Sequence, residues 1–541
     1  MNSKARIEFG DFQTPLPLAR EVCNRLRAEG VAADVILEPT CGNGTFLIAA
    51  AETFTRSTLR GWDINQSYVE AATAALKQAR VSKRSSVQCQ DFFAHDWEME
   101  LQKTSGRLLI LGNLPWVTNS AVSALNGSNL PAKENFMGLR GIAARTGKSN
   151  FDISEWMLIR LVRALRGREA TVAMLCKTAT ARKLLRYAWQ NDGRIAKAAL
   201  YRIDATEHFG ASVDACLLLA RMGSAGPETT DVFDSLSAIK SSVRMGLAGR
   251  DWVADIVAYR RMQHLEGLCP FQWRSGVKHD CAGVMELRSA KVGHFENKLG
   301  EVVELEPQYL FPLLKCTDLA NGNTIPERFV VVTQRHVGDD TAVMADTVPL
   351  TWRYLQSHRK KFEARGSSIY KGRMPFALFG IGGYAFAPWK VAVSGLHRDP
   401  SFRVIGPCKG KPVFMDDTCY YLPFERESLA RLVADILNSE PCRQFLQSLI
   451  FTGVKRSVTV DLLQRLNLSA IAEEAGLDKQ WHALERTDYK TSQPAPQLQL
   501  VMETASRAIK GVSEKHTPIR YGRRSKAVSQ VADKVGLEMP K

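Results

Sequence analysis

An amide, a proline and a large aromatic side chain follow one another where an apolar run of the chain ends. The run Leu108–Leu111 leads, one glycine later, into Asn113, Leu114, Pro115 and Trp116. The amino group of a base such as adenine is a poor nucleophile because its lone pair is delocalised into the ring. If the side-chain oxygen of Asn113 and the backbone carbonyl of Leu114 accept its hydrogens, the nitrogen becomes more tetrahedral and can attack an electrophilic methyl group. Trp116 offers a face on which an extruded base can stack, whereas an Asn-Pro turn beside a core tryptophan is the alternative explanation.

A glycine-containing turn lies upstream, directly after a shorter apolar run. In "EPTCGNGTF", Gly42 and Gly44 would open the turn into the following helix, and glycine lets the backbone approach a ligand closely. The third glycine of the dinucleotide fingerprint is absent, because Leu47 stands in its place. The turn alone is therefore a weak signal of ligand binding.

Acidic residues end the next two predicted strands. Asp63 lies in "GWDIN" and Asp91 in "QDFF", where Phe92 follows it. A carboxylate at the second strand end can accept hydrogen bonds from ribose hydroxyls, and Asp91 could accept from an adenine amino group beside Phe92. Acids at strand ends also cap helices, but their succession on neighbouring strands favours an adenosyl pocket.

An alternating pattern of strands and helices must position these residues. Short apolar runs such as "DVILEP", "LRGWDI", "RLLILGN" and "VDACLLLA" predict strands, while "NQSYVEAATAALKQAR" and "NFDISEWMLIRLVRAL" have helical periodicity. Such alternation predicts an α/β fold with a mostly parallel, doubly wound, Rossmann-like sheet covered on both faces. We expect this domain to occupy residues 1–222.

The order of these motifs resembles the gamma class of adenine-specific DNA methyltransferases, to which the TaqI enzyme belongs. The resemblance rests on "DFQTP", "EPTCGNGTF", "GWDI", "DFF" and "GNLPW", and continues through "GKSNFDISEWMLIRLVRAL" and "YRIDATEHFGASVDACLLLA". It implies S-adenosylmethionine as the cofactor. By motif position the donor pocket would be lined by Thr14, Glu38, Gly42, Gly44, Asp63, Asp91, Phe92 and Pro115. Asn113, Leu114, Pro115 and Trp116 would hold the target base, with Phe209 as a second aromatic wall.

One position departs from the family pattern. The family usually has a proline where this chain has Leu114. The groups that the chemistry requires are a backbone carbonyl and an aromatic face, so the substitution preserves both. An Asn-Leu-Pro-aromatic tetrad also resembles the ribosomal RNA adenine dimethyltransferases, which lack the "QTP" element. RNA therefore stays open as the alternative substrate.

Composition indicates the class of partner. The chain of 541 residues carries a formal net charge of +16, which favours a polyanionic partner, with nucleic acid first and a merely basic surface as the alternative. We expect a cytoplasmic protein without a membrane span or signal peptide, because no apolar run is long enough. The eleven cysteines are scattered and form no metal-ligand pattern, so we expect reduced thiols and no metal site.

The second half of the chain has a different organisation. A polar stretch, residues 223–242, predicts a linker, residues 243–510 predict an α+β target-recognition domain, and residues 511–541 predict a basic, flexible tail. Basic side chains interleaved with aromatics between residues 352 and 373 predict DNA contacts, with a solvated helix face as the alternative. The predicted contact residues are Arg353, Arg359, Lys360, Lys361, Arg365, Lys371 and Arg373.

Two tempting motifs fail on inspection. Gly147, Lys148 and Ser149 lack the upstream glycine of a phosphate loop, and we expect the polar segment 117–145 to form either a flap over nucleic acid or a static loop. Asp280 and Glu286 are followed by an arginine where a nuclease motif has lysine. A fused restriction activity is therefore not expected.

These residues together predict a site-specific, base-flipping DNA methyltransferase. It would act as a monomer on the exocyclic amino group of adenine in a short duplex DNA sequence, and would protect DNA from a separately encoded cognate restriction endonuclease. The alternatives are a ribosomal RNA adenine methyltransferase and a catalytically weak subunit that binds the methyl donor and DNA. The sequence does not give the recognition site.

Overall fold

The computed structural model describes residues 13–116 and 153–488, apart from positions 192, 250, 292, 452, 454 and 455. The chain divides into two compact units, Met1–Asp478 and Lys479–Lys541. The three β-sheets formed by the described residues belong to the first unit. Of the second unit, only residues in helix α21 (Asp478–Asp488) are described. The predicted flap 117–145, the segment 147–149 and the tail 511–541 lie outside the described residues.

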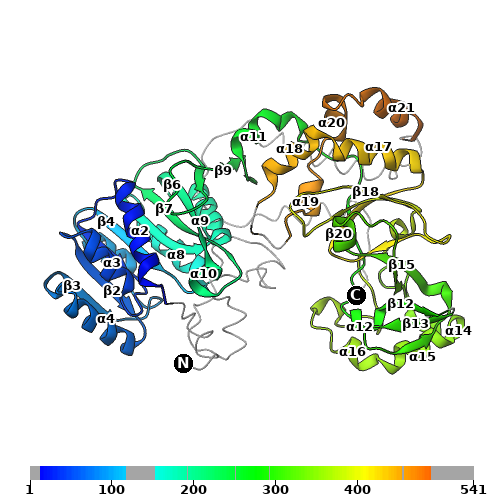
Figure 1. The fold of residues 1–541 in the computed structure, drawn as a ribbon, viewed down its shortest axis with the longest axis horizontal. Coiled ribbons are helices and arrows are strands. Elements are labelled where there is room, and N and C mark those ends of the chain that lie inside the picture. The colour runs from blue at the N-terminus through cyan, green and yellow to red at the C-terminus, as the bar shows by residue number, and fades with distance from the viewer. Residues whose placement is uncertain are drawn as a thin grey trace, which may run out of the picture. The chain divides into compact units, whose positions relative to one another are not determined.

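The first region of the chain folds into a ten-stranded sheet (Figure 1). Its strands are β1 (Val35–Glu38), β2 (Thr58–Asp63), β3 (Ser85–Cys89), β4 (Leu108–Asn113), β5 (Ala170–Lys177), β6 (Ile195–Asp204), β7 (Asp214–Met222), β8 (Thr229–Phe233), β9 (Val243–Ala248) and β10 (Asp251–Val253). They lie in the order β10-β9-β8-β6-β7-β5-β4-β1-β2-β3. Strands β1 to β5 pair in parallel, and β7 is antiparallel between β5 and β6. The order 3-2-1-4-5-6 of a doubly wound sheet is thus kept with one strand inserted, which confirms the predicted α/β fold.

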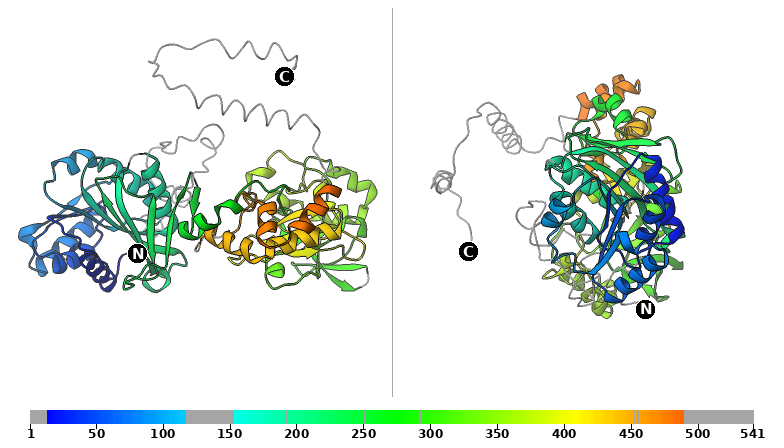
Figure 2. Two further views of the ribbon diagram at one scale, coloured as in Figure 1. Left: turned by 90° about the horizontal axis from the view of Figure 1, so that it is seen from above. Right: turned by 90° about the vertical axis from the view of Figure 1, so that its left-hand side faces the viewer.

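Helices pack on both faces of this sheet (Figure 1 and Figure 2). One face is covered by α2 (Leu16–Ala28), α3 (Thr45–Thr53) and α4 (Gln66–Gln78), and the other by α5 (Trp97–Lys103), α8 (Ile153–Ala164) and α9 (Thr178–Gln190). Strand β1 shows why a strand in the middle of this sheet must be apolar on both faces. Ile36 packs with the first group of helices, whereas Val35 and Leu37 pack with the second. A strand buried on both faces cannot alternate apolar with polar residues.

The predicted linker is wrong in part. Residues 229–233 form strand β8, which pairs with β6 and β9 inside the sheet. The strand is short and alternates half-buried with buried residues, so its composition is that of a polar segment. The sheet also continues through β9 and β10 to Val253. The region built on this sheet therefore extends about thirty residues beyond the predicted boundary at residue 222.

Two smaller sheets and many short helices form the rest of the described chain, as expected of an α+β region. The four-stranded sheet, in the order β11-β20-β17-β18, contains β11 (Arg274–Ser275), β17 (Trp389–Ser394), β18 (Arg403–Ile405) and β20 (Cys419–Phe424). The six-stranded sheet, in the order β14-β13-β12-β16-β15-β19, contains β12 (Glu286–Lys291), β13 (His294–Asn297), β14 (Val302–Glu304), β15 (Leu310–Leu314), β16 (Arg328–Val331) and β19 (Phe414–Met415). The helices of this region include α11 (Ile256–Met262), α13 (Cys316–Ala320), α15 (Pro349–Ser357), α16 (Arg359–Glu363), α17 (Glu427–Asn438), α18 (Glu440–Leu449) and α20 (Leu468–Glu474).

All eleven cysteines are free thiols, and only Cys89 and Cys408 are not buried. Within the described ranges, no group of three or more histidine, cysteine or acidic residues could hold a metal ion. None of the helices in those ranges is long and apolar enough to cross a membrane.

Candidate active site

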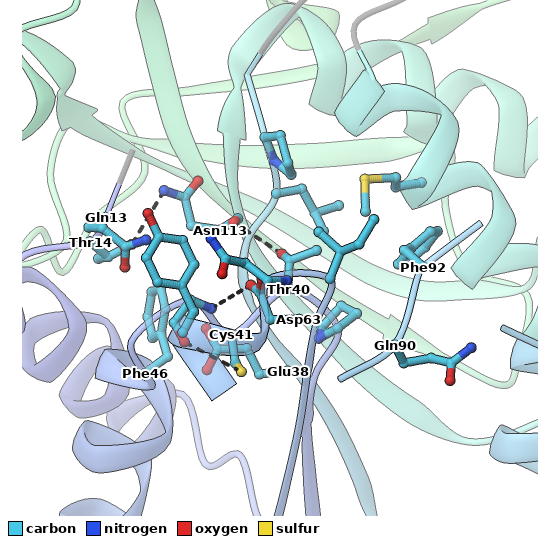
Figure 3. A pocket seen from close by; sticks show the side chains of 18 of the residues that line it. Gln13, Thr14, Glu38, Thr40, Cys41, Phe46, Asp63, Gln90, Phe92 and Asn113 are labelled. Carbon is cyan, nitrogen blue, oxygen red and sulfur yellow. Dashed lines mark hydrogen bonds between the residues drawn. The ribbon is translucent and has the colours of Figure 1, made fainter. Parts of the chain in front are cut away.

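A cavity opens where β1, β2, β3 and β4 end, with a volume of about 1050 Å³ counted out to solvent (Figure 3). The carboxyl ends of parallel strands meet at one edge of a sheet, which is where ligands of this fold bind. Most of the predicted site residues line the cavity: Thr14, Glu38, Gly42, Asp63, Asp91, Phe92, Asn113, Leu114 and Pro115. Three predicted residues do not line it: Gly44, Trp116 and Phe209.

The turn after β1 brings backbone against the acid that ends β2. Gly42 has a φ of +49°, and its N–H donates to Oδ2 of Asp63 at 2.9 Å. A Cβ at Gly42 would lie 2.6 Å from Oε1 of Gln13. Asp63 also accepts from the N–H of Asn65 through Oδ1 at 2.9 Å. Each carboxylate oxygen can accept a further hydrogen bond, so Asp63 is fixed in place and can still bind hydroxyl groups.

Gly44 has a structural role that the sequence did not reveal. It precedes α3 with a φ of +78° and does not line the cavity. A Cβ there would lie 2.9 Å from Cβ of Ala72 in α4. Glycine at this position therefore allows α3 to begin close to α4, and the prediction of a ligand contact at Gly44 is corrected.

Glu38, the last residue of β1, is a buried carboxyl group at the floor of the cavity. Its side chain is only 3% exposed, and Oε2 has no hydrogen-bond partner among the described residues. Burial raises the pKa of this carboxyl well above its usual range, and the nearby Asp63 raises it further. A buried carboxylate without a cation is costly, so the site suits a ligand that brings a positive charge.

The loop after β3 supplies the apolar side of the cavity. Asp91 accepts from the N–H of Phe93 at 2.8 Å, which is the turn-capping role considered as an alternative, and it also lines the cavity. Phe92 is 5% exposed and packs 4.8 Å from the Trp97 ring. Arg160 of α8 donates to the backbone oxygen of Phe93 at 2.7 Å. Side chains from two helices thus hold this loop against the cavity.

Asn113 ends β4 and lies beside Thr14 at the edge of the cavity (Figure 3). Its Nδ2 donates to Oγ1 of Thr14 at 3.3 Å, and its backbone oxygen accepts from Oγ1 of Thr40 at 3.4 Å. The amide nitrogen thus faces Thr14, and the side-chain oxygen Oδ1 is buried. The side chain of Leu114 is 1% exposed and packs in the core under the cavity. An apolar side chain therefore fits where the family usually has proline.

Trp116 and Phe209 contact each other. Their ring centroids are 5.0 Å apart at an angle of 65°, and both residues are buried. Edge-to-face packing at this distance leaves no room for a base between the rings. The two predicted aromatic walls are therefore neighbours, but they do not form an open slot in this structure.

Several cavity residues were not predicted from the sequence. Gln13 precedes the predicted Thr14, and Ile64 follows the strand-end acid Asp63 with 43% of its surface exposed. The sequence signal at this position is an apolar residue directly after a strand-end acid. Lys177, at the end of β5, does not line the cavity, but it donates through Nζ to the backbone oxygen of Trp116 at 3.1 Å. The remaining unpredicted lining residues are Pro39, Thr40, Cys41, Thr45, Phe46, Asn65, Tyr68, Gln90, Phe93, Ile153 and Met157.

The predicted DNA contacts between residues 353 and 373 separate into two groups. Arg365 donates to the backbone oxygens of Phe362, His279, Ala377 and Pro375 at 2.9–3.2 Å, and burial lowers the pKa of its guanidinium. It is a structural residue, and its predicted role is corrected. The other predicted residues are exposed: Arg353, Arg359, Lys360, Lys361, Lys371 and Arg373.

The aromatics that suggested base or sugar contacts in this segment belong to the core. Trp352 packs edge-on to Phe376 at 5.4 Å. The hydroxyl of Tyr354 donates to the backbone oxygen of Val284 at 2.8 Å, and Tyr370 is buried. The interleaving of basic and aromatic residues thus reflects a helix with one buried face.

No protein-family model matches the chain. The solved structure of the Type IIL restriction-modification enzyme MmeI in complex with DNA aligns with a TM-score of 0.50 and 12% identity, over 94% of this chain and 80% of that one. A Listeria monocytogenes protein assigned to the class I S-adenosylmethionine-dependent methyltransferases aligns with a TM-score of 0.30 and 13% identity, over 43% of this chain and 68% of that one.

The alignment with MmeI shows that the two chains share a fold. The Type II methyltransferase M.NspV of Nostoc sp. is 42% identical over 477 residues, which cover 87% of this chain and 98% of that protein. The chain therefore belongs to the Type II methyltransferases.

Proposed function

We propose that the protein transfers a methyl group from S-adenosylmethionine to the exocyclic amino group of adenine in a short duplex DNA sequence. The observation that carries this proposal is the position of Asn113 at the edge of the strand-end cavity, with its amide nitrogen held by Thr14 at 3.3 Å. The order of motifs, with Thr14 upstream of the glycine turn, supports assignment to the gamma class.

The cavity residues fit S-adenosylmethionine by their chemistry. Asp63 is fixed by two backbone N–H groups and can accept from ribose hydroxyls. Ile64 and Phe92 offer apolar surface to an adenine ring. Glu38, the buried carboxyl, suits the positive charge that the cofactor carries. When bound, the cofactor supplies an electrophilic methyl group on a sulfonium.

The target amino group would be held by acceptors at the end of β4. The amide oxygen of Asn113 and the backbone oxygen of Leu114 would accept its two hydrogens, which localises the nitrogen lone pair for attack. The base must leave the duplex to reach this edge of the sheet. Trp116 would provide a stacking face once its contact with Phe209 opens. The surplus proton leaves to solvent after transfer, since no side chain is required as a base.

The DNA substrate is supported by the relatives and by charge. M.NspV is a Type II methyltransferase, and MmeI is described as a restriction-modification enzyme solved with DNA. The net charge of +16 suits a polyanion. We infer that the protein protects DNA from a cognate restriction endonuclease, and that it works in the cytoplasm as a monomer.

Purified protein and radiolabelled methyl donor test the proposal directly. Duplex DNA should accept label on adenine N6, and ribosomal RNA should accept none. Asn113→Ala should lower the rate by roughly 10²- to 10³-fold, the cost of losing one preorganised polar contact to the reacting group. Donor affinity, measured by calorimetry, should change little. Label on RNA alone, or on cytosine, would contradict the proposal, as would full activity of Asn113→Ala.

A further inference from the structure

The two-stranded ribbon formed by β12 and β13 carries a charged face that the proposed chemistry does not use. Arg288 pairs across the ribbon with Glu296, and on its other side with Arg328 of β16. Residues two apart on a strand share a face, so Glu286 lies on the same side as Arg288. A cavity over this face is lined by Glu286, Arg288, Glu296, Lys298 and Arg328, together with Leu287, Asn297 and Gly300.

The opposite face of the same ribbon is part of the core. Leu287 is 1% exposed and belongs to the apolar cluster of the six-stranded sheet, and Phe295 and Phe329 pack against that cluster. Asn297 is buried and donates to the Tyr354 hydroxyl at 2.9 Å. The ribbon is therefore anchored on one side, and its charged side is held at a fixed register.

Glu286 contacts the basic side chains beside this face and holds them in place. It is 3% exposed, and Nζ of Lys298 and Nζ of Lys315 each lie 2.6 Å from one of its oxygens. Nε2 of His279 lies 3.5 Å away. Lys298 remains half exposed, so its ammonium group is positioned by a buried carboxylate and still faces solvent. Such an ammonium can contact a phosphate without first losing much side-chain freedom.

Arg288 and Glu296 are both exposed and, although they are cross-strand neighbours, no ion pair joins them among the described residues. Other opposite charges in this part of the chain do pair, as Arg328 does with Asp318 at 2.5 Å. The guanidinium group of Arg288 offers hydrogen-bond donors, and the neighbouring carboxylate of Glu296 offers acceptors. The major-groove edge of a G·C pair presents acceptors on guanine and a donor on cytosine, which match this pair.

We propose that the charged face of the β12–β13 ribbon reads base edges in the major groove of the substrate duplex. Arg288 and Glu296 contact a G·C pair of the recognition sequence, and Lys298, positioned by Glu286, contacts a backbone phosphate. The major groove admits a two-stranded ribbon, and the residues from Arg288 to Lys291 that the structure describes are all exposed. This inference rests on the proposed function, because it requires duplex DNA as the substrate.

The test uses the full chain and the duplex sequence that the wild-type protein methylates, together with all its single-base-pair variants. Arg288→Ala and Glu296→Gln should each lower kcat/KM on the cognate duplex by about 10- to 100-fold. Both variants should also methylate the cognate duplex and the duplexes changed at one G·C position at more similar rates than the wild type does. Lys298→Ala should instead weaken binding to all duplexes alike and reduce the slope of log affinity against log salt by about 0.9.

Lys83→Ala is the matched control, since Lys83 is an exposed cation of the catalytic sheet region. It should leave the rate and the discrimination unchanged. Thermal unfolding of Arg288→Ala, Glu296→Gln and Lys83→Ala should match the wild type, as should the donor affinity of all variants. An active wild type whose discrimination is unaltered by Arg288→Ala and Glu296→Gln overturns the base-reading role. Uniform loss of activity over every duplex overturns it as well. A wild-type protein that methylates no duplex DNA overturns the proposed function itself.

Discussion

Two glutamates, Glu38 in the catalytic region and Glu286 in the C-terminal region, are each only 3% exposed but differ in their surroundings. Among the described residues, no cation forms an ion pair with Glu38 and its Oε2 has no hydrogen-bond partner; burial and Asp63 raise its pKa. Burial acts on Glu286 in the same direction, but contacts with His279, Lys298 and Lys315 lower its pKa to about 2. The carboxyl of Glu38 therefore suits a positively charged ligand, whereas the carboxyl of Glu286 belongs to an internal network of ion pairs. Burial alone does not distinguish a binding group from a structural one.

The largest expected effect on stability is at Glu286. Glu286→Ala should lower the free energy of unfolding by about 3 kcal/mol, the low end for breaking a buried ion pair, because Lys298 can reach solvent. The pKa of Glu286 is depressed in the folded state from 4.5 to about 2. The stability it contributes is therefore present above pH 4.5 and is lost as the pH falls toward 2. Urea unfolding between pH 2 and 7 measures this, and a Glu286→Gln variant as stable as the wild type at pH 7 would contradict it.

Arg365 is expected to behave as a structural residue. Arg365→Met leaves backbone oxygens of Phe362, His279, Ala377 and Pro375 without their donor. We expect a loss of about 2 kcal/mol in the free energy of unfolding, with the salt dependence of DNA binding unchanged. Denaturant unfolding and binding titrations at several salt concentrations separate the two effects. A reduced salt slope at full stability would restore Arg365 to the DNA interface.

Glu38→Gln should weaken S-adenosylmethionine binding by about tenfold, or roughly 1.4 kcal/mol, because the charged partner of the cofactor is lost. Wild-type affinity should rise as the pH rises toward the raised pKa of Glu38 and the carboxyl ionises, whereas the affinity of the variant should stay level. Since its folded pKa is raised, Glu38 stabilises the ligand-free protein at low pH and loses that contribution as the pH rises. The ligand-free variant should therefore be the more stable protein at alkaline pH. Calorimetric titration over pH provides the measurement, and an unchanged affinity would remove Glu38 from the binding site.

The smallest effect is expected at the exposed cations of the predicted contact segment. Lys371→Ala should reduce DNA affinity by a few-fold, equally for cognate and non-cognate duplexes, and lower the salt slope by about 0.9. The stability of the protein should stay the same, because Lys371 is exposed. Fluorescence anisotropy at increasing salt measures the slope. If the salt slope of Lys371→Ala equals that of the wild type, Lys371 does not contact a DNA phosphate.

The positions of Asp63 and Asn113 at one edge of the sheet could be predicted from the sequence, because strand ends fix where side chains go. Asp63 and Asn113 are the last residues of buried strands, and parallel pairing brings their ends to one edge. Gly44 was misassigned because close packing of two helices and close approach of a ligand both require glycine. The strand β8 was missed because a short strand near the end of a sheet has the composition of a linker.

The C-terminal region was less predictable because composition does not reveal partners. Arg365 and Lys371 look alike in the sequence, but only the fold shows that Arg365 is bonded to four backbone oxygens. The register that places Arg288 beside Glu296 depends on the pairing of β12 with β13. Such pairing is set by the whole sheet, which local periodicity does not give.

The most direct test of the central claim is to map modified bases in a living cell. The wild-type protein and Asn113→Ala are expressed in a bacterial host without adenine methyltransferases, and the genomic DNA is analysed by long-read sequencing. We predict N6-methyladenine in one short recurring sequence for the wild type and almost none for the variant at equal protein levels. Unmodified DNA in cells that contain folded wild-type protein, or equal methylation by both proteins, would contradict the assignment of this site.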